Sequence, residues 1–198
     1  DAVKRLSLAM DQGTGAIEIK SGYGLTIEGE LKMLRIIQAL KKGSPIPIKS
    51  TLLACHAVPE GDWNASTWTD AAIKELIPAA IEQGLADYVD AFCETGYFSV
   101  EDLNKLLGAI EDSPLKAKVH VNQFSTLGGV AACVEHGALS VDHLEELSDE
   151  DLAALETTLE RNKQPVFSVA LPGCSHFLGI PYTPVRRLMD AGLPVALA

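Results

Sequence analysis

Short apolar runs alternate along this chain with longer segments in which apolar residues recur every three or four positions. The short runs indicate buried β-strands, and the longer segments indicate amphipathic α-helices. The pattern predicts seven strands, at residues 16–20, 48–55, 88–93, 115–121, 138–142, 165–170 and 194–197. Helices are predicted before and between them, at residues 3–10, 26–40, 70–83, 100–110, 127–136, 148–162 and 183–191.

Small polar residues mark where several of these helices begin. Thr26 and Ser99 precede helical segments, and their hydroxyl groups can accept a hydrogen bond from a free backbone N–H of the first turn. Ser148, with Asp151 three residues later, has the spacing of a capping box. Gly137 is a typical residue just beyond a helix C-terminus.

The alternation of strands and helices predicts an α/β fold, in which a parallel sheet has helices outside it. A doubly wound open sheet usually carries a GxGxxG turn after its first strand, and this sequence has none. We therefore expect a (β/α)8 TIM barrel, with its active site at the C-terminal ends of the strands. Residues 1–198 would supply strands 2 to 8, because the chain opens on a helix and stops within a strand. We expect it to be part of a longer chain that holds the first strand and the C-terminal end.

Composition and charge limit the classes of partner that the protein is expected to bind. The formal net charge of -11 argues against nucleic acid or an anionic membrane, because both require clustered Lys and Arg, and a small molecule is the expected partner. No apolar run approaches the roughly 20 residues of a membrane-spanning helix. The four cysteines form no CxxC pair, which indicates buried free thiols in a reducing compartment, so we expect a cytoplasmic protein.

Histidines carry the strongest chemical signal. His120 stands where an apolar run gives way to a polar segment, and a histidine at the mouth of a buried strand can be a metal ligand or a general acid or base. His56 and His143 end other predicted strands. The three are too far apart in sequence for zinc-finger or HExxH spacing, so any metal site must be assembled by the fold.

Other polar residues at strand ends allow both structural and functional interpretations. Lys20 is either an exposed strand end or functional, and Tyr23 is either a loop aromatic on the barrel rim or part of a site. Glu94 is costly to bury alone, so it is either paired or tuned for function. Asp142 alternates with His143, which places it on the opposite side of the strand and favours a structural role. His176 would lie in a loop on the active face, and its role stays open.

Six short segments contain most of these residues: EIKSGYGL at 18–25, CHAVP at 55–59, FCE at 92–94, KVHVNQ at 118–123, DHL at 142–144 and LPG at 171–173. Together, and in this order, they resemble the imidazolonepropionases of the metal-dependent amidohydrolase superfamily, which are (β/α)8 barrels. The resemblance covers nearly the whole chain, and the combination of segments is specific where one segment alone would not be.

The resemblance implies metal-dependent hydrolysis of a cyclic amide, 4-imidazolone-5-propanoate, to N-formimidoyl-L-glutamate in histidine degradation. The family holds one zinc or iron ion with an HxH pair on the first strand, a histidine on the fifth and an aspartate on the eighth. His120 would be the fifth-strand ligand, and the other three ligands would lie outside this chain. The resemblance also implies a homodimer for the full-length protein.

Four further residues receive roles from the resemblance. His143, on the sixth strand, would be catalytic, stabilising the developing oxyanion or passing a proton. Tyr23 and His56 match substrate-binding positions. Gln123 stands where some members have glutamate, and since an amide is no general base it would orient water or substrate by hydrogen bonding. Two alternatives stay open: another cyclic amide or an amino-purine as substrate, or a catalytically incomplete fragment.

Overall fold

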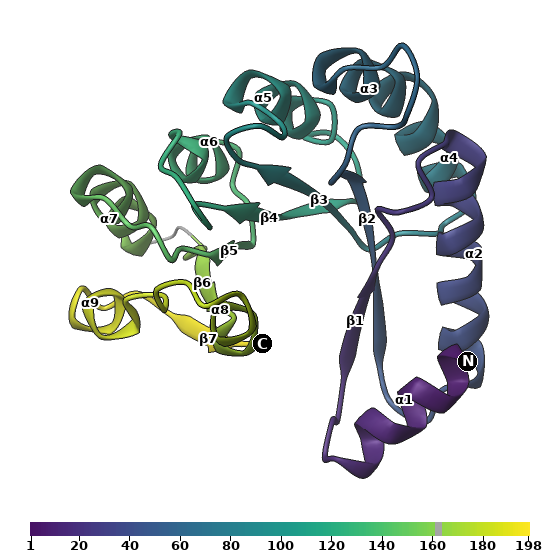
Figure 1. Cartoon of the computed structure of the whole chain (residues 1–198), viewed down its shortest axis with the longest axis horizontal. Helices are drawn as coiled ribbons and strands as arrows, with labels where there is room; N and C mark the ends of the chain where they lie inside the picture. The colour runs from purple at the N-terminus through teal and green to yellow at the C-terminus, as the bar shows by residue number, and fades with distance from the viewer. Residues whose placement is uncertain (161–163) are drawn as a thin grey trace.

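The computed structural model describes residues 1–160 and 164–198, and its centre is a curved parallel β-sheet (Figure 1). In the described residues seven strands pair in sequence order, so each strand lies beside its neighbours in the chain. The strands are β1 (Ile17–Lys20), β2 (Ile48–Cys55), β3 (Tyr88–Cys93), β4 (Lys116–Val121), β5 (Ser140–His143), β6 (Phe167–Ala170) and β7 (Val195–Leu197).

Helices cover the outer, convex side of the sheet (Figure 1). Those that follow strands β1 to β5 are α2 (Ile27–Gly43), α3 (Ala65–Ala71), α4 (Ile77–Glu82), α5 (Val100–Gly108), α6 (Gly129–Glu135) and α7 (Asp149–Glu156). A π-helical turn, η1 (Ala72–Leu76), joins α3 to α4, and a 3-10 turn, η2 (Thr157–Leu159), follows α7. The remaining helices are α1 (Ala2–Asp11), α8 (Pro172–Leu178) and α9 (Val185–Asp190). No helix in the described part of the chain is long and apolar enough to span a bilayer.

The two faces of the sheet differ in chemistry because side chains alternate along each strand. Val89 of β3 and Val119 of β4 point outward and are fully buried in the core formed with the helices. Leu34 of α2 and Leu106 of α5 belong to the same core and are at most 1% exposed. The inner face carries charged residues instead, and these build the site described below.

The parallel α/β fold predicted from the sequence is confirmed. Each adjacent pair of strands is parallel in register, and the sheet curls into part of a barrel whose edges in the described residues are β1 and β7. Closure into an eight-stranded barrel stays a prediction, because this sheet is open between those edges (Figure 1).

Several predicted helix boundaries were wrong. The helix predicted at residues 70–83 begins at Ala65, where the Asn64 side chain accepts a hydrogen bond from the Thr67 backbone. The helix predicted at 127–136 begins at Gly129, because Gly128 has a left-handed φ of 91° that ends the preceding loop. The segment holding His176, predicted to be a loop, forms α8.

The remaining boundaries are closer to prediction. The predicted helix 148–162 is helical to Glu156 and continues as a 3-10 turn to Leu159, and its last two residues lie outside the described residues. The strand predicted at 165–170 begins two residues later, at Phe167. The strands predicted at 48–55 and 88–93 match β2 and β3.

Candidate functional site

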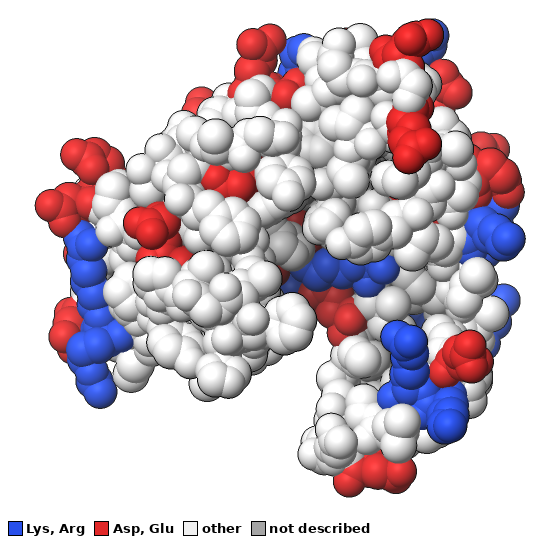
Figure 2. Space-filling model, in the orientation of Figure 1, with Lys and Arg blue, Asp and Glu red and all other residues white. Residues whose placement is uncertain are grey.

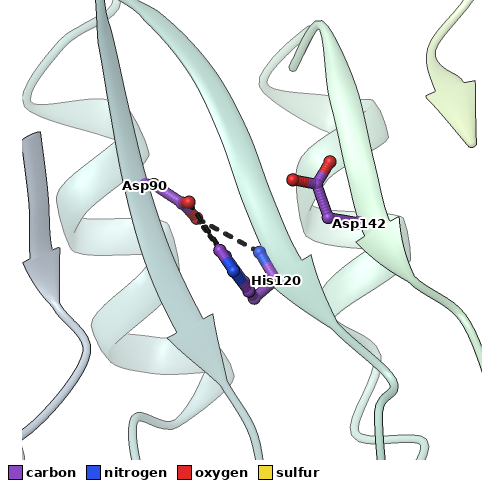
Figure 3. Close-up of side chains that lie close together, drawn as sticks. All are labelled: Asp90, His120 and Asp142. Atoms are coloured by element: carbon purple, nitrogen blue, oxygen red, sulfur yellow. Dashed lines mark hydrogen bonds and ion pairs between the residues drawn. The ribbon is translucent and has the colours of Figure 1, made fainter. Parts of the chain in front are cut away.

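The candidate site lies on the inner face of the sheet, at the C-terminal ends of its strands. The register places Phe92 of β3 beside His120 of β4, and His120 beside Asp142 of β5. Figure 3 shows Asp90 and His120 facing each other from β3 and β4, with Asp142 on β5. Figure 2 shows a hollow inside the curve of the sheet, where acidic and basic side chains lie next to each other.

Asp90 fixes the orientation of His120. Its carboxylate lies 2.8 Å from His120 Nδ1 and accepts a second hydrogen bond, of 3.2 Å, from the His120 backbone N–H. Burial would raise the pKa of Asp90, but the positive charges of His120 and Lys20 hold it well below its usual range. An ionised carboxylate only accepts hydrogen bonds, so Nδ1 must carry a proton, and Nε2 is the nitrogen that can bind a ligand once the imidazolium has lost its second proton.

Lys20 ties three carboxylates together. Its ammonium lies 2.7 Å from Asp90, 3.3 Å from Asp142 and 3.6 Å from Glu18, and Glu18 in turn pairs with Lys118. Burial would lower the pKa of Lys20, but the surrounding carboxylates raise it above its usual value. The Lys20 side chain is only 24% exposed, so its interpretation as an exposed strand end was wrong.

This cluster offers two arrangements for holding a metal ion, and one of them fits better. One donor atom each from Asp90, His120 and Asp142 lies within 4.8 Å of the others, so this triad could hold an ion. However, the Lys20 ammonium already bonds both carboxylates, and an ion placed between them would be repelled by it. His120 Nε2 is the better donor, with Asp90 as the carboxylate that orients a ligating histidine through its other nitrogen.

Asp142 faces this charged cluster, contrary to the sequence prediction. It pairs in register with His120, is 4% exposed, and accepts hydrogen bonds from Lys20 and from Ser140 Oγ. The prediction assumed that His143 would occupy the inner face and Asp142 the outer one. Alternation holds as far as Asp142, and the exception is His143.

His143 reaches the site through an unusual backbone. Its φ is 89° and that of Leu144 is 61°, so the chain turns sharply at the end of β5. The His143 ring centroid then lies 5.2 Å from that of His120, and Nδ1 lies 3.3 Å from Glu145. Thr183 Oγ1 donates a 2.6 Å hydrogen bond to the His143 carbonyl oxygen. Left-handed backbone is costly for a residue with a side chain and often occurs at functional sites.

His56 and Tyr23 form an aromatic wall beside His120. The Tyr23 and His56 ring centroids are 4.9 Å apart, and His56 lies 5.8 Å from Phe92 and 6.4 Å from His120. Burial, followed by the nearby charge of His120, lowers the pKa of His56, which favours the neutral imidazole. His56 Nδ1 is buried and has no hydrogen-bond partner in the described residues.

No family model matches the chain. It is 52% identical over 198 residues to the imidazolonepropionase of Christiangramia forsetii, an alignment that covers 100% of this chain and 47% of that relative. The similarity to this imidazolonepropionase thus extends over the whole length of the chain.

Other imidazolonepropionases align in the same way. The protein of Flavobacterium johnsoniae is 52% identical over 195 residues and that of Aeromonas hydrophila is 42% identical over 199, with 98% and 100% of this chain covered. The chain spans about half the length of these relatives, 46% and 47% respectively. The resemblance inferred from six short segments is thus confirmed along the entire sequence.

Solved structures share the fold. A guanine deaminase from C. acetobutylicum superposes with a TM-score of 0.69 at 14% identity, covering 99% of this chain and 48% of that one. An adenine deaminase from Arthrobacter aurescens gives a TM-score of 0.70 at 12% identity, with 98% and 59% covered. At such low identity, these similarities establish the fold alone.

The remaining residues singled out from the sequence are Gln123, Glu94 and His176. Gln123 is 8% exposed, and its amide nitrogen lies 3.6 Å from Cys174 Sγ on α8. Glu94 is paired structurally: it accepts hydrogen bonds from the Thr95 and Phe124 backbones and from Ser125, and so anchors the loop after β4. His176 is on α8, where Nδ1 lies 3.3 Å from the Tyr182 hydroxyl.

Two residues were not predicted from the sequence: Asp90, and Glu30, whose carboxylate accepts hydrogen bonds from the Gly22 and Gly24 backbones beside Tyr23. Asp90 is a single carboxylate within the apolar run of β3, and a charge inside a buried strand is a signal that could have been used. Glu30 lies in a helical segment among other charged residues, and nothing in its sequence context distinguishes it.

Proposed function

We propose that the full-length protein hydrolyses 4-imidazolone-5-propanoate to N-formimidoyl-L-glutamate, as an imidazolonepropionase of histidine degradation. The 52% identity to such an enzyme across the whole chain carries this proposal. The site geometry supports it, because the predicted residues His120, His143, His56 and Tyr23 lie within one chain of ring contacts.

His120 would be a metal ligand through Nε2, held in place by Asp90. Its Nδ1 lies 2.8 Å from the Asp90 carboxylate and is occupied by that hydrogen bond. Nε2 is then the ring nitrogen left to bind a metal. A bound zinc or iron ion would supply Lewis acidity for the attack of water on the ring amide. That this metal is zinc or iron is also a proposal.

His143 would assist the reaction at the substrate carbonyl. Its ring lies 5.2 Å from that of His120, so a group near His120 is also within reach of His143. It can donate a hydrogen bond to the oxygen that gains negative charge, or pass a proton to the departing nitrogen. Positioned acid and base groups of this kind contribute roughly 10²- to 10⁴-fold in rate.

The aromatic wall would bind the substrate ring. The lowered pKa of His56 favours the neutral imidazole, and its buried Nδ1 has no hydrogen-bond partner among the described residues, so it would offer a hydrogen bond to a polar ring atom. Tyr23 would stack beside it at the open rim, since its side chain is largely exposed. Gln123 would orient water or substrate through its amide.

The cellular location and the oligomeric state of the protein are also proposals. A cytoplasmic location is supported by the four cysteines, which are all free and of which three are buried. A homodimer for the full-length protein stays a prediction.

A substrate panel tests the proposed function. Purified full-length protein loaded with zinc or iron should hydrolyse imidazolone propanoate, measured by the loss of its ultraviolet absorbance, and should leave guanine and adenine unchanged. The purines serve as controls, since the shared fold includes deaminases of both. Turnover of a purine without turnover of imidazolone propanoate would contradict the proposal and indicate that the protein is a deaminase instead.

A further inference from the structure

The loop after β1 is held from beneath by a buried carboxylate. Glu30, in the first turn of α2, accepts hydrogen bonds from the backbone N–H groups of Gly22 at 2.7 Å, Gly24 at 2.6 Å and Leu25 at 3.2 Å. Glu30 is 1% exposed. Both of its carboxylate oxygens are therefore used to fix one short stretch of backbone.

The loop backbone can lie against the start of α2 only because Gly24 and Gly29 meet there. A Cβ on Gly24 would lie 2.4 Å from the backbone of Gly29, and a Cβ on Gly29 would lie 2.4 Å from the Gly24 carbonyl oxygen. The φ angles of Gly22 and Leu25 are 120° and 50°. The loop is thus pressed onto the start of α2 in a conformation that an unsupported chain would rarely adopt.

The loop amides are already occupied. Converging backbone N–H groups form a typical binding place for an anion. Here the anion is the Glu30 side chain, which comes from the same chain and is inaccessible to solvent. The N–H groups of Gly22, Gly24 and Leu25 are therefore unavailable to a substrate carboxylate, and the loop contributes to the site through the side chain that it carries.

That side chain is Tyr23, which lies between the clamped amides of Gly22 and Gly24. Its ring rests 4.9 Å from His56, and it is 69% exposed, so packing by other residues holds it only loosely. The position of the Tyr23 ring thus depends on the backbone on both sides of it, and that backbone depends on Glu30.

We infer that Glu30 is a positioning residue for substrate binding: by clamping the loop amides, it fixes Tyr23 against His56 as one wall of the site. This inference rests on the proposed function, in which those two residues contact the substrate. Glu30 touches neither His120 nor His143, so its effect falls on binding more than on the chemical step.

The test compares Glu30→Gln with Thr26→Ala in the full-length protein. Glutamine directs an NH2 group at backbone N–H donors, whereas Thr26 Oγ1 accepts a hydrogen bond from Gly29 N and so caps the same helix, and none of the clamping hydrogen bonds of the described loop involves its side chain. Glu30→Gln should raise KM for imidazolone propanoate about tenfold, equivalent to the loss of one hydrogen bond to a charged group. The fall in kcat should be smaller, and metal content should not change. Hydrogen exchange at residues 22–25 should accelerate.

Thr26→Ala destabilises the start of α2 but should keep both KM and the slow exchange of the loop amides. Glu30→Asp, which retains the charge on a shorter side chain, should have a KM and an exchange rate between those of wild type and Glu30→Gln, and it replaces Glu30→Gln in the test if that variant does not fold.

Unchanged KM and exchange in both Glu30 variants overturn the inference. Equal effects from Thr26→Ala overturn it as well, because they indicate general helix damage. If wild type shows no turnover, the proposed function fails, while the exchange data still report whether Glu30 clamps the loop.

Discussion

Asp90 makes two hydrogen bonds to His120 across adjacent strands, and Lys20 bonds the same carboxylate from a third strand. The sequence places a histidine at the end of a buried run, but it does not give the strand register that brings these partners together. His143 shows the same limit, because side-chain alternation predicts its face correctly only if the backbone stays extended. Its φ of 89° breaks that rule.

Asp90→Asn tests how His120 is held. Asparagine keeps the shape but removes the charge that orients Nδ1–H, so metal affinity of the full-length protein should fall about 10- to 100-fold. Competition with a coloured chelator measures it. Asp87→Asn is the matched control, since Asp87 lies before β3 and pairs with Lys41 and Lys49 instead. Equal metal affinity in wild type and Asp90→Asn would contradict the assigned role.

The helices show what local sequence can and cannot predict. The caps at Thr26, Ser99 and Ser148 are confirmed, because each depends on a side chain and a backbone amide only three residues apart. Helix α8 was missed because its Pro-Gly start resembles a turn, although proline is well suited to the first helical position. The π-turn before α4 was also missed. There, Pro78 lacks the N–H that a regular helix requires, and the wider turn accommodates its ring.

Asp87 joins α2 and β2 to the start of β3, and it makes stability depend on pH. Burial would raise the pKa of Asp87, but Lys49, the Ser50 backbone and Lys41 lower it to about 2. A lowered folded-state pKa contributes stability above the unfolded-state value near 3.8, and that contribution is lost as the pH falls toward about 2.

Asp87→Asn should therefore cost about 1 kcal/mol of unfolding free energy at pH 7, a value reduced by the partial exposure of its lysine partners. The difference from wild type should shrink between pH 4 and pH 2. Urea unfolding of the full-length protein at several pH values measures it, with Asp112→Asn, at an exposed position, as the control. A difference that stays constant over that range would exclude the proposed pairing.

The whole molecule is a curved parallel sheet with apolar residues outside and charges inside. Strand and helix alternation predicts that architecture, and the fold of the solved deaminases agrees with it over nearly the whole chain. The inner face, in contrast, is defined only once residues from β1, β3, β4 and β5 meet, as Lys20, Asp90, His120 and Asp142 do. The proposed function of this inner face depends on His120.

The decisive experiment compares full-length wild type with His120→Ala, with metal content measured by elemental analysis and activity measured as imidazolone propanoate hydrolysis. His176→Ala is the control, since His176 lies on α8 beside Tyr182. Wild type and the control should hold about one zinc or iron ion per chain and turn over substrate, as in catalytic metal hydrolases. His120→Ala should lose both. Full metal content and activity in His120→Ala would contradict the account.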